Sequence, residues 1–411
     1  MVIRLCRRWR TFQPQAVASS VDSLRDDEPS RSFVVSSGGH RRLLTSWTRC
    51  SFGGTEGEAL MPDNGEYRVY LGAYTGVESA ADGIRLAIAG ADGALRCTES
   101  VAETADPSFL AVAPDGATLF AVSELQAGRV IAFSVRADGT LGEINSQPSL
   151  GAAPCHLSVH PSGKYLLTAN YGSGNLVVHP IDAGGVLREP CHVVQHSGSG
   201  PNPQRQEGPH AHQVLADPSG RYVVAVDLGT DSVYVYDFDL DGGHLMIKHE
   251  VPLRAGAGPR HLAFHPDAER AYVINELASS ITEFGYDAAT GALEPGRTLS
   301  TLPPDYGRPN LAAELVVTPD GRFVFGSNRG HDSIAVFRAD SSDGEFRLID
   351  IRPAVVAEPR HIALSPNGRV LFAAGQRSNN VQAFGIADNG ELTPLREPVP
   401  TPSPVCILPA A

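Results

Sequence analysis

The sequence lacks several features that would assign a function class at once. No apolar run approaches the roughly 18–20 residues that a membrane-spanning helix needs. The net charge of −13 over 411 residues argues against a nucleic-acid partner. Six cysteines, at positions 6, 50, 97, 155, 191 and 406, form no CxxC pair, which indicates free thiols in a reducing compartment and neither a disulfide framework nor a zinc site. We therefore expect a cytoplasmic protein without a membrane or nucleic-acid partner, a cofactor or a metal.

The first sixty residues differ in composition from the rest. Residues 1–60 contain nine arginines and only six acidic residues. Such a start is compatible with an organelle transit peptide. A disordered extension or a mis-assigned upstream start is favoured, because Met61 directly precedes the ordered pattern "MPDNGEYRVYLGAYTG". We expect residues 61–411 to form a single domain.

What the sequence has is a repeat, marked by six turns of one form. They are "APDG" at Pro114, "HPSG" at Pro161, "DPSG" at Pro218, "HPDA" at Pro266, "TPDG" at Pro319 and "SPNG" at Pro366, spaced by 47 to 57 residues. Proline followed by Asp, Ser or Asn and then Gly is typical of tight turns. Alternating apolar residues on both sides, as in "HLSVH" and "YLLTAN", predict that each turn joins two strands of a β-hairpin.

A third strand, another glycine turn and a weaker fourth strand follow each hairpin. Four strands in each period of about 40–50 residues are the signature of a β-propeller. Residues 67–95 have the pattern of later strands without a first one, whereas 403–410 have only the first-strand pattern. The sequence therefore predicts an all-β, seven-bladed propeller of four-stranded antiparallel blades, closed by N- and C-terminal strands in one shared blade. A β-solenoid is the alternative fold.

The turn prolines also predict which residues surround the central channel. The start of the first strand and the end of the second lie at the same face of a propeller, near its axis. Six residues before each proline lie Ser108, Cys155, His212, Arg260, Ala313 and Arg360, and ten residues after it lie Glu124, Tyr171, Leu228, Glu276, Arg329 and Gln376. Such a gathering of charged groups near the axis favours shifted pKa values and a functional site, although arginine–glutamate pairs there can also be purely structural.

The longest interval adds a loop next to this predicted site. Its extra residues fall in "HSGSGPNPQRQEG" (196–208), directly before His210. A polar loop of this length can contribute to a binding site. Arg205 and Gln206 would then be available to a ligand.

The ordered motifs resemble those of the lactonase-type seven-bladed propeller family, which includes 6-phosphogluconolactonase and carboxymuconate cyclase. The resemblance covers roughly residues 67–410, through "RQEGPHAHQV", "GPRHLAFHP", "YVINEL" and "SNRGHDSIAVF". The family's functional residues fall on His212, Arg260, Glu276 and Arg329. The resemblance implies hydrolysis of an anionic sugar lactone, most specifically 6-phosphoglucono-1,5-lactone in the pentose phosphate pathway.

With no GxSxG nucleophile motif in the chain, direct attack by water is the simpler hypothesis. Either Glu276 or His212 could be the general base if partial burial tunes its pKa toward neutral pH. Arg260 and Arg329 would bind phosphate or the developing oxyanion. Further expected substrate contacts are Arg205, Gln206, His210, Arg360 and His156.

Three alternatives stay open at this point. His210 and His212 lie two residues apart and could supply two metal ligands. A cyclase that forms a lactone from a muconate-type diacid would need similar arginines. A propeller without activity could be a protein-docking platform, although only 7% of the residues are aromatic. For the assembly we expect a monomer or a weak homo-oligomer.

Overall fold

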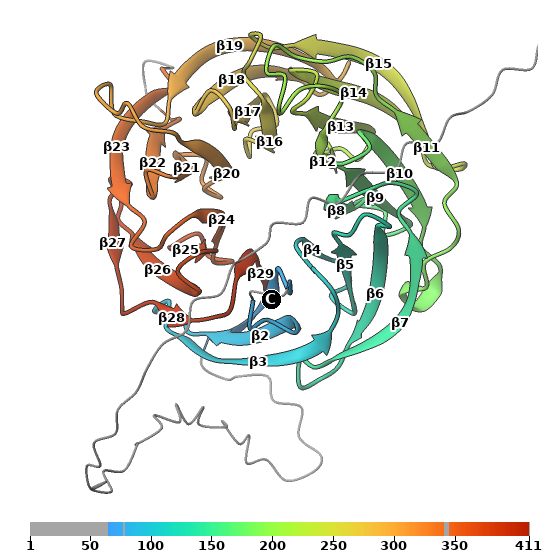
Figure 1. The fold of residues 1–411 in the computed structure, drawn as a ribbon, viewed down its shortest axis with the longest axis horizontal. Coiled ribbons are helices and arrows are strands. Elements are labelled where there is room, and N and C mark those ends of the chain that lie inside the picture. Colours follow the sequence, from blue (N-terminus) through green and yellow to red (C-terminus); the bar gives the residue numbers. More distant parts are fainter. Residues whose placement is uncertain (1–64, 77–78, 341–344, 411) are drawn as a thin grey trace, which may run out of the picture. The chain divides into compact units, whose positions relative to one another are not determined.

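The computed structural model describes residues 65–76, 79–340 and 345–410, so the predicted extension 1–60 and the domain start at Met61 lie outside the described residues. The described chain forms seven antiparallel sheets, the blades of a β-propeller (Figure 1). The predicted fold class is therefore confirmed. No helix in this part of the chain is long and apolar enough to cross a bilayer.

Each blade runs outward from an innermost strand beside the channel (Figure 1). The first blade that is continuous in sequence consists of β4 (Leu110–Val112), β5 (Thr118–Ser123), β6 (Arg129–Val135) and β7 (Leu141–Pro148). The second consists of β8 (Pro154–Val159), β9 (Tyr165–Asn170), β10 (Asn175–Pro180) and β11 (His192–Gln195), with the short 3-10 turn η1 (Ala183–Gly185). The third consists of β12 (Ala211–Ala216), β13 (Tyr222–Asp227), β14 (Ser232–Asp239) and β15 (His244–Pro252).

The next three blades repeat this order. The fourth consists of β16 (Pro259–Phe264), β17 (Arg270–Asn275), β18 (Ser280–Asp287) and β19 (Ala292–Ser300). The fifth consists of β20 (Leu311–Val317), β21 (Phe323–Arg329), β22 (Ser333–Arg338) and β23 (Arg347–Pro353). The sixth consists of β24 (Pro359–Leu364), β25 (Val370–Gly375), β26 (Asn380–Ile386) and a split outer strand, β27 (Leu392–Pro394) and β28 (Val399–Pro400). Both β27 and β28 pair with β26.

The last blade joins the two ends of the described chain. It has the order β29 (Pro404–Ala410), β1 (Tyr67–Ala73), β2 (Gly83–Ala89) and β3 (Leu95–Glu103). The innermost strand β29 pairs antiparallel with β1, with Tyr70 opposite Leu408. The predicted shared blade is therefore confirmed, and it closes the ring of blades.

The repeated turn imposes one backbone conformation. The fourth residue of the turn has φ between +56° and +72° in all six copies: Gly116, Gly163, Gly220, Ala268, Gly321 and Gly368. Glycine reaches this left-handed region without steric cost, which explains its recurrence. Ala268 is the one non-glycine residue of the set.

The apolar residues of the alternating strands pack between neighbouring blades. Each of seven buried clusters in the described chain combines residues of two adjacent blades. Val223 and Ala225 of β13, for example, pack with Leu167 and Ala169 of β9. The core is thus a ring around the axis, which leaves the innermost strands free to present polar side chains to the channel.

Candidate active site

A β-bulge recurs in the innermost strands and directs side chains toward the channel. Cross-strand pairing skips Cys155 in β8, His212 in β12, Arg260 in β16 and Arg360 in β24. A bulged residue has no residue opposite it, and the local twist re-aims its side chain. These are four of the six positions found by counting back from the turn prolines, so most of the first predicted ring is built on bulged residues.

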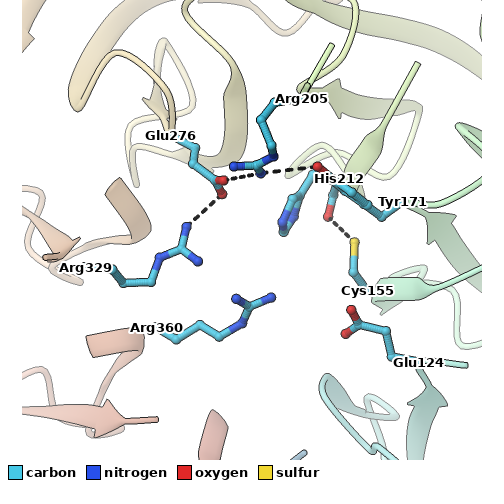
Figure 2. Close-up of a pocket in the computed structure, with 8 residues that line it drawn as sticks. All are labelled: Glu124, Cys155, Tyr171, Arg205, His212, Glu276, Arg329 and Arg360. Atoms are coloured by element: carbon cyan, nitrogen blue, oxygen red, sulfur yellow. Dashed lines mark hydrogen bonds and ion pairs between the residues drawn. The ribbon is translucent and has the colours of Figure 1, made fainter. Parts of the chain in front are cut away.

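A polar cavity of about 260 Å³ lies at the mouth of the channel (Figure 2). Its lining residues are Glu124, Cys155, Tyr171, Arg205, His212, Glu276, Arg329 and Arg360. All except Arg205 occupy one of the two positions that the turn prolines specify. The volume is close to the lower end of the roughly 300–1,000 Å³ of small-molecule sites.

Glu276 is the centre of an ion-pair cluster on one wall of this cavity. It follows β17 and is 2% exposed. Its Oε2 lies 2.8 Å from Nη2 of Arg329, and its Oε1 accepts a hydrogen bond of 2.5 Å from Arg205 (Figure 2). Its Oε2 also lies 3.3 Å from Nε of Arg260. One carboxylate therefore holds three guanidinium groups. Those of Arg205 and Arg329 line the cavity, whereas Arg260 is buried outside its lining and donates to the backbone oxygen of Ala313 at 2.6 Å.

These contacts decide the protonation of the cluster. Burial raises the pKa of Glu276, but Arg329, Arg260 and Arg205 outweigh it and lower the pKa to about 2. Burial lowers the pKa of Arg329 to about 10, opposed by Glu276. The expectation that burial tunes Glu276 toward neutral pH is therefore wrong, because three positive charges surround the carboxylate. Glu276 is ionised at neutral pH and is a weak base.

His212 projects into the same cavity from the bulge of β12 (Figure 2). Its Nδ1 is buried without a hydrogen-bond partner among the described residues, so Nε2 is the nitrogen that can meet a ligand. Burial, reinforced by the nearby Arg260, lowers the pKa of His212 well below its ordinary value of 6.5. The ring is consequently neutral at neutral pH and has a free lone pair, but burial shifts the pKa of His212 away from neutral pH, so the expected tuning toward neutral pH is wrong for this residue too.

A second carboxylate, Glu124, lies on the other side of the cavity (Figure 2). The hydroxyl of Tyr74 donates to both of its oxygens, at 3.1 and 3.0 Å, and accepts a hydrogen bond of 2.9 Å from Arg360. Burial raises the pKa of Glu124, although Arg360 opposes this. Arg360 itself makes no ion pair with a described carboxylate, so its charge is available to a ligand.

Cys155 is a cavity residue that cannot easily act as a nucleophile. Its thiol lies 3.3 Å from the backbone oxygen of His212. Burial raises the pKa of the Cys155 thiol, and Glu124 adds to this effect. Because the thiolate is the reactive form of cysteine, the protonated thiol is a wall of the cavity.

The long loop before β12 brings one of its two predicted residues to the cavity. Arg205 reaches Glu276 and Tyr171, and its side chain is 33% exposed. Gln206 points the other way and is fully buried, where it donates to the backbone oxygen of Leu228 at 2.8 Å and to Asp231 at 2.7 Å. Gln206 thus anchors the loop that presents Arg205, and it does not line the cavity.

The other two predicted substrate contacts also lie outside the cavity lining. His210 stacks on the ring of Tyr171, with centroids 4.5 Å apart, and its Nδ1 bonds to the backbone oxygen of Tyr171 at 2.9 Å. His156 is buried beside Phe109 and His261.

The metal hypothesis for His210 and His212 lacks a third ligand. His210 turns to Tyr171, whereas His212 faces the cavity. In the ranges that the structure describes, no three His, Cys, Asp or Glu side chains are grouped to hold a metal ion.

Four residues of the site escaped selection from the sequence. Counting from the turns did give Glu124, Cys155 and Tyr171. Glu124 belonged to the predicted gathering of charged groups but received no role, and nothing in the residue type of Cys155 or Tyr171 distinguished them. Tyr74 directly follows β1 of the shared blade, where it corresponds to Glu276 after β17. It could not be found by counting, because the chain ends replace the proline turn in that blade.

Comparisons with known proteins agree with this architecture. The family model described as lactonase, 7-bladed beta-propeller, matches residues 68–409. A Bacillus subtilis protein named 6-phosphogluconolactonase is 34% identical over 346 residues, which cover 83% of this chain and 98% of that protein. A Pectobacterium carotovorum protein of the same name is 33% identical over 309 residues, covering 74% and 89%.

Solved structures give the same result. The periplasmic gluconolactonase of Pseudomonas aeruginosa superimposes with a TM-score of 0.79 at 32% identity, covering 84% of this chain and 99% of that one. A Lactobacillus plantarum protein gives a TM-score of 0.79 at 31% identity, with the same coverage.

Proposed function

Because the chain belongs to the seven-bladed β-propeller lactonase family, we propose that it hydrolyses 6-phosphoglucono-1,5-lactone to 6-phosphogluconate, a step of the pentose phosphate pathway. The observation that carries the proposal is the cavity itself, in which a neutral histidine, His212, faces several guanidinium groups. The names of the Bacillus and Pectobacterium relatives support the phosphorylated substrate. The catalytic domain is residues 61–411.

In this proposal His212 is the general base. Its Nε2 takes a proton from a water molecule as the water oxygen bonds to the lactone carbonyl carbon, and the carbonyl oxygen becomes an oxyanion. Collapse of the oxyanion breaks the bond from that carbon to the ring oxygen, which takes the proton back from His212. The resulting carboxylic acid ionises at neutral pH. A neutral ring suits this role, because a protonated one could not accept the proton.

The arginines share the remaining work. Arg329 lines the cavity and is fixed by Glu276, so it offers preorganised donors to the oxyanion. Arg260, buried outside the cavity lining, supports this role by holding Glu276. Arg360 and Arg205 bind the phosphate, since arginine forks match phosphate geometry. Glu276 keeps these groups converged without taking the proton. Gln206 and His210 act indirectly, by holding the loop and Tyr171.

A rate assay tests the function directly. The purified protein is expected to accelerate the hydrolysis of 6-phosphogluconolactone over its spontaneous rate, and to act more weakly on unphosphorylated gluconolactone, which offers nothing to Arg360 and Arg205. A muconolactone is the control for the cyclase alternative. Turnover of the muconolactone alone would replace the lactonase assignment, and no acceleration with any of the three would leave the binding platform as the better hypothesis.

The pH profile tests the choice of base. We expect kcat/KM to stay high as the pH falls through 6.5, and to decline only well below it. The sign follows because neutral His212 is the active form and burial lowers its pKa. Initial rates between pH 4 and 8, corrected for the uncatalysed reaction, measure this. An acid limb above pH 6.5 would contradict the assignment of His212.

The cellular location and the assembly are part of the same proposal. We place the protein in the cytoplasm as a monomer or weak homo-oligomer. Of the described cysteines, Cys155, Cys191 and Cys406 are free thiols, which is compatible with a reducing compartment. Cell fractionation and light scattering test both points, with the periplasm as the other outcome.

The docking-platform alternative receives less support. Exposed aromatic anchors are typical of protein interfaces, yet the large exposed hydrophobic residues of the described chain include no aromatic side chain.

A further inference from the structure

A second layer of polar side chains lies next to the bulged residues. We call it the lower ring and define it as the polar residues that lie five positions before a turn proline, each directly after a position of the first ring: His156, Gln213, His261, Glu314 and His361. In the blades of β8, β12 and β24, the side chain of the lower-ring residue accepts a hydrogen bond from a backbone amide in the innermost strand of the next blade. The amide of Val214 donates to His156, that of Leu262 to Gln213 and that of Ile407 to His361. In these three blades the lower ring joins neighbouring blades.

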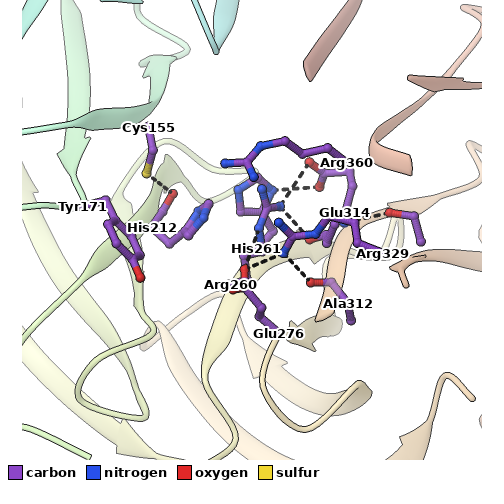
Figure 3. Close-up of polar contacts among 12 residues, drawn as sticks. Cys155, Tyr171, His212, Arg260, His261, Glu276, Ala312, Glu314, Arg329 and Arg360 are labelled. Carbon is purple, nitrogen blue, oxygen red and sulfur yellow. Dashed lines mark hydrogen bonds and ion pairs between the residues drawn. The ribbon is translucent and has the colours of Figure 1, made fainter. Parts of the chain in front are cut away.

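The blade of β16 departs from this pattern. His261 Nδ1 meets a carboxylate of the next blade, Glu314 Oε1, at 2.8 Å (Figure 3). Glu314 is buried, and the same oxygen also accepts a hydrogen bond from the backbone amide of Leu315. A structural link between blades does not need a buried carboxylate, because in the blades of β8, β12 and β24 a backbone amide provides that link. The exception therefore requires a different explanation.

The hydrogen bonds fix where the ring protons lie. His361 accepts the Ile407 amide at Nδ1, so its own proton is on Nε2, the nitrogen that lies 3.4 Å from Glu314 Oε2. The carboxylate likewise retains the proton of His261 on Nδ1. His261 Nε2 is then left with a lone pair, and it is buried without a partner in the described chain.

The neighbour of this lone pair is the proposed base. The rings of His261 and His212 are in contact, with centroids 5.0 Å apart and planes at 68° (Figure 3). His212 Nδ1 is the complementary group, since it too is buried and unpartnered. Leaving both nitrogens unpaired would cost about 1–3 kcal/mol for each. The two nitrogens are not hydrogen-bonded to each other in the structure, and one water molecule bridging them would satisfy both at once.

We propose that Glu314 and His261 are positioning residues, which hold the proton of His212 on Nδ1 and so keep the lone pair of its Nε2 directed into the cavity. The N–H of His212 reaches His261 Nε2 through one bridging water molecule. When His212 takes the proton of the attacking water at Nε2, the charge on its ring is stabilised by His261 and, beyond it, by Glu314. No proton leaves His261, and the proton on Nε2 returns to the ring oxygen. A fixed tautomer with an oriented ring is what such histidine–carboxylate arrangements provide.

The surroundings of His261 account for its neutrality. Burial lowers its pKa well below 6.5, and the charges of Arg260, Arg360 and Arg329 act in the same direction, with Glu276 opposing them. The titratable groups that face it from the neighbouring strands are His156, His212 and Glu314, with His361 on the far side of Glu314.

The test reads the tautomer of His212 by two-bond ¹H–¹⁵N NMR of the full-length protein labelled with ¹⁵N-histidine, with the signal assigned by its loss in His212→Ala. We expect the Nδ1–H form in the wild type and a shift toward the Nε2–H form in His261→Phe. In the same variant kcat should fall by about 10–100-fold, the usual effect of removing a group that orients a catalytic ligand, with little change in KM. Glu314→Gln, which keeps the shape, should lower kcat in the same direction.

His179→Phe is the matched control. His179 is fully buried in β10, with Nδ1 unpartnered and Nε2 bonded to Pro148, so this variant removes a comparable histidine away from the cavity and should leave the tautomer and kcat unchanged. A wild-type His212 in the Nε2–H form, or an unchanged tautomer or kcat in His261→Phe, would overturn the inference. The inference rests on the proposed role of His212, but the NMR measurement needs no substrate, so its failure is distinguishable from failure of the lactonase assignment.

Discussion

Replacing His212 with alanine is expected to lower kcat by on the order of 10²–10⁴-fold, the usual contribution of a general base. The substitution leaves the water without a proton acceptor, because Glu276, with a pKa of about 2, is too weak a base to replace it. KM should change little, since the arginines that bind the substrate remain. Initial rates above the spontaneous background measure the effect.

A rescue experiment separates lost chemistry from lost structure in this variant. Imidazole added to His212→Ala can enter the space that the ring leaves and should restore part of the rate. Near-wild-type turnover of the variant without imidazole would rule out His212 as the base.

The second large effect is expected for Glu276→Gln. This variant leaves the buried guanidinium groups of Arg329 and Arg260 without their shared counter-charge. Loss of one partner of a buried ion pair costs about 3–5 kcal/mol. Since the oxyanion donors lose their anchor, kcat should also fall by on the order of 10²–10³. Urea unfolding and the rate assay give the two readouts.

The acid side of the stability curve provides an independent check. Folding lowers the pKa of Glu276 from 4.5 to about 2, so its contribution is complete above pH 4.5 and is lost as the pH falls toward 2. By linkage this amounts to about 3 kcal/mol. The wild type should lose stability over this window more steeply than Glu276→Gln.

An exposed ion pair gives the matched control for Glu276→Gln. Glu391 lies 3.1 Å from Arg352, and both side chains are well exposed. Glu391→Gln should cost less than about 1 kcal/mol and leave kcat unchanged. An equal loss of stability in the two glutamine variants would contradict the special role of the buried cluster.

The sequence allowed the propeller, its shared blade and much of the cavity lining to be predicted, because one turn recurs at a fixed place in each repeat. Residues at the same distance from that turn occupy equivalent positions in their strands, because the backbone register is the same in each blade. Counting from the turn therefore located His212, Arg260, Glu276 and Arg329 at one mouth before any contact was known.

What could not be predicted depends on contacts between blades. Gln206 follows Arg205 in sequence, yet its direction is set by Asp231 and the Leu228 backbone. The pKa of Glu276 depends on three arginines from separate segments of the chain. The lower ring was also hidden, because simple alternation places the residues after the bulged positions on the opposite side of the strand, and only the bulge lets both face inward.

These bulges also bear on how such a protein can change over evolutionary time. Cys155, His212, Arg260 and Arg360 have no cross-strand partner, so exchanging one of these side chains leaves the ladder of hydrogen bonds and the register of its blade intact. The backbone of the fold can thus lose or acquire a chemical group one blade at a time. The cost of an exchange is then set by the side-chain partners alone, and it is highest at Arg260, which pairs with the buried Glu276.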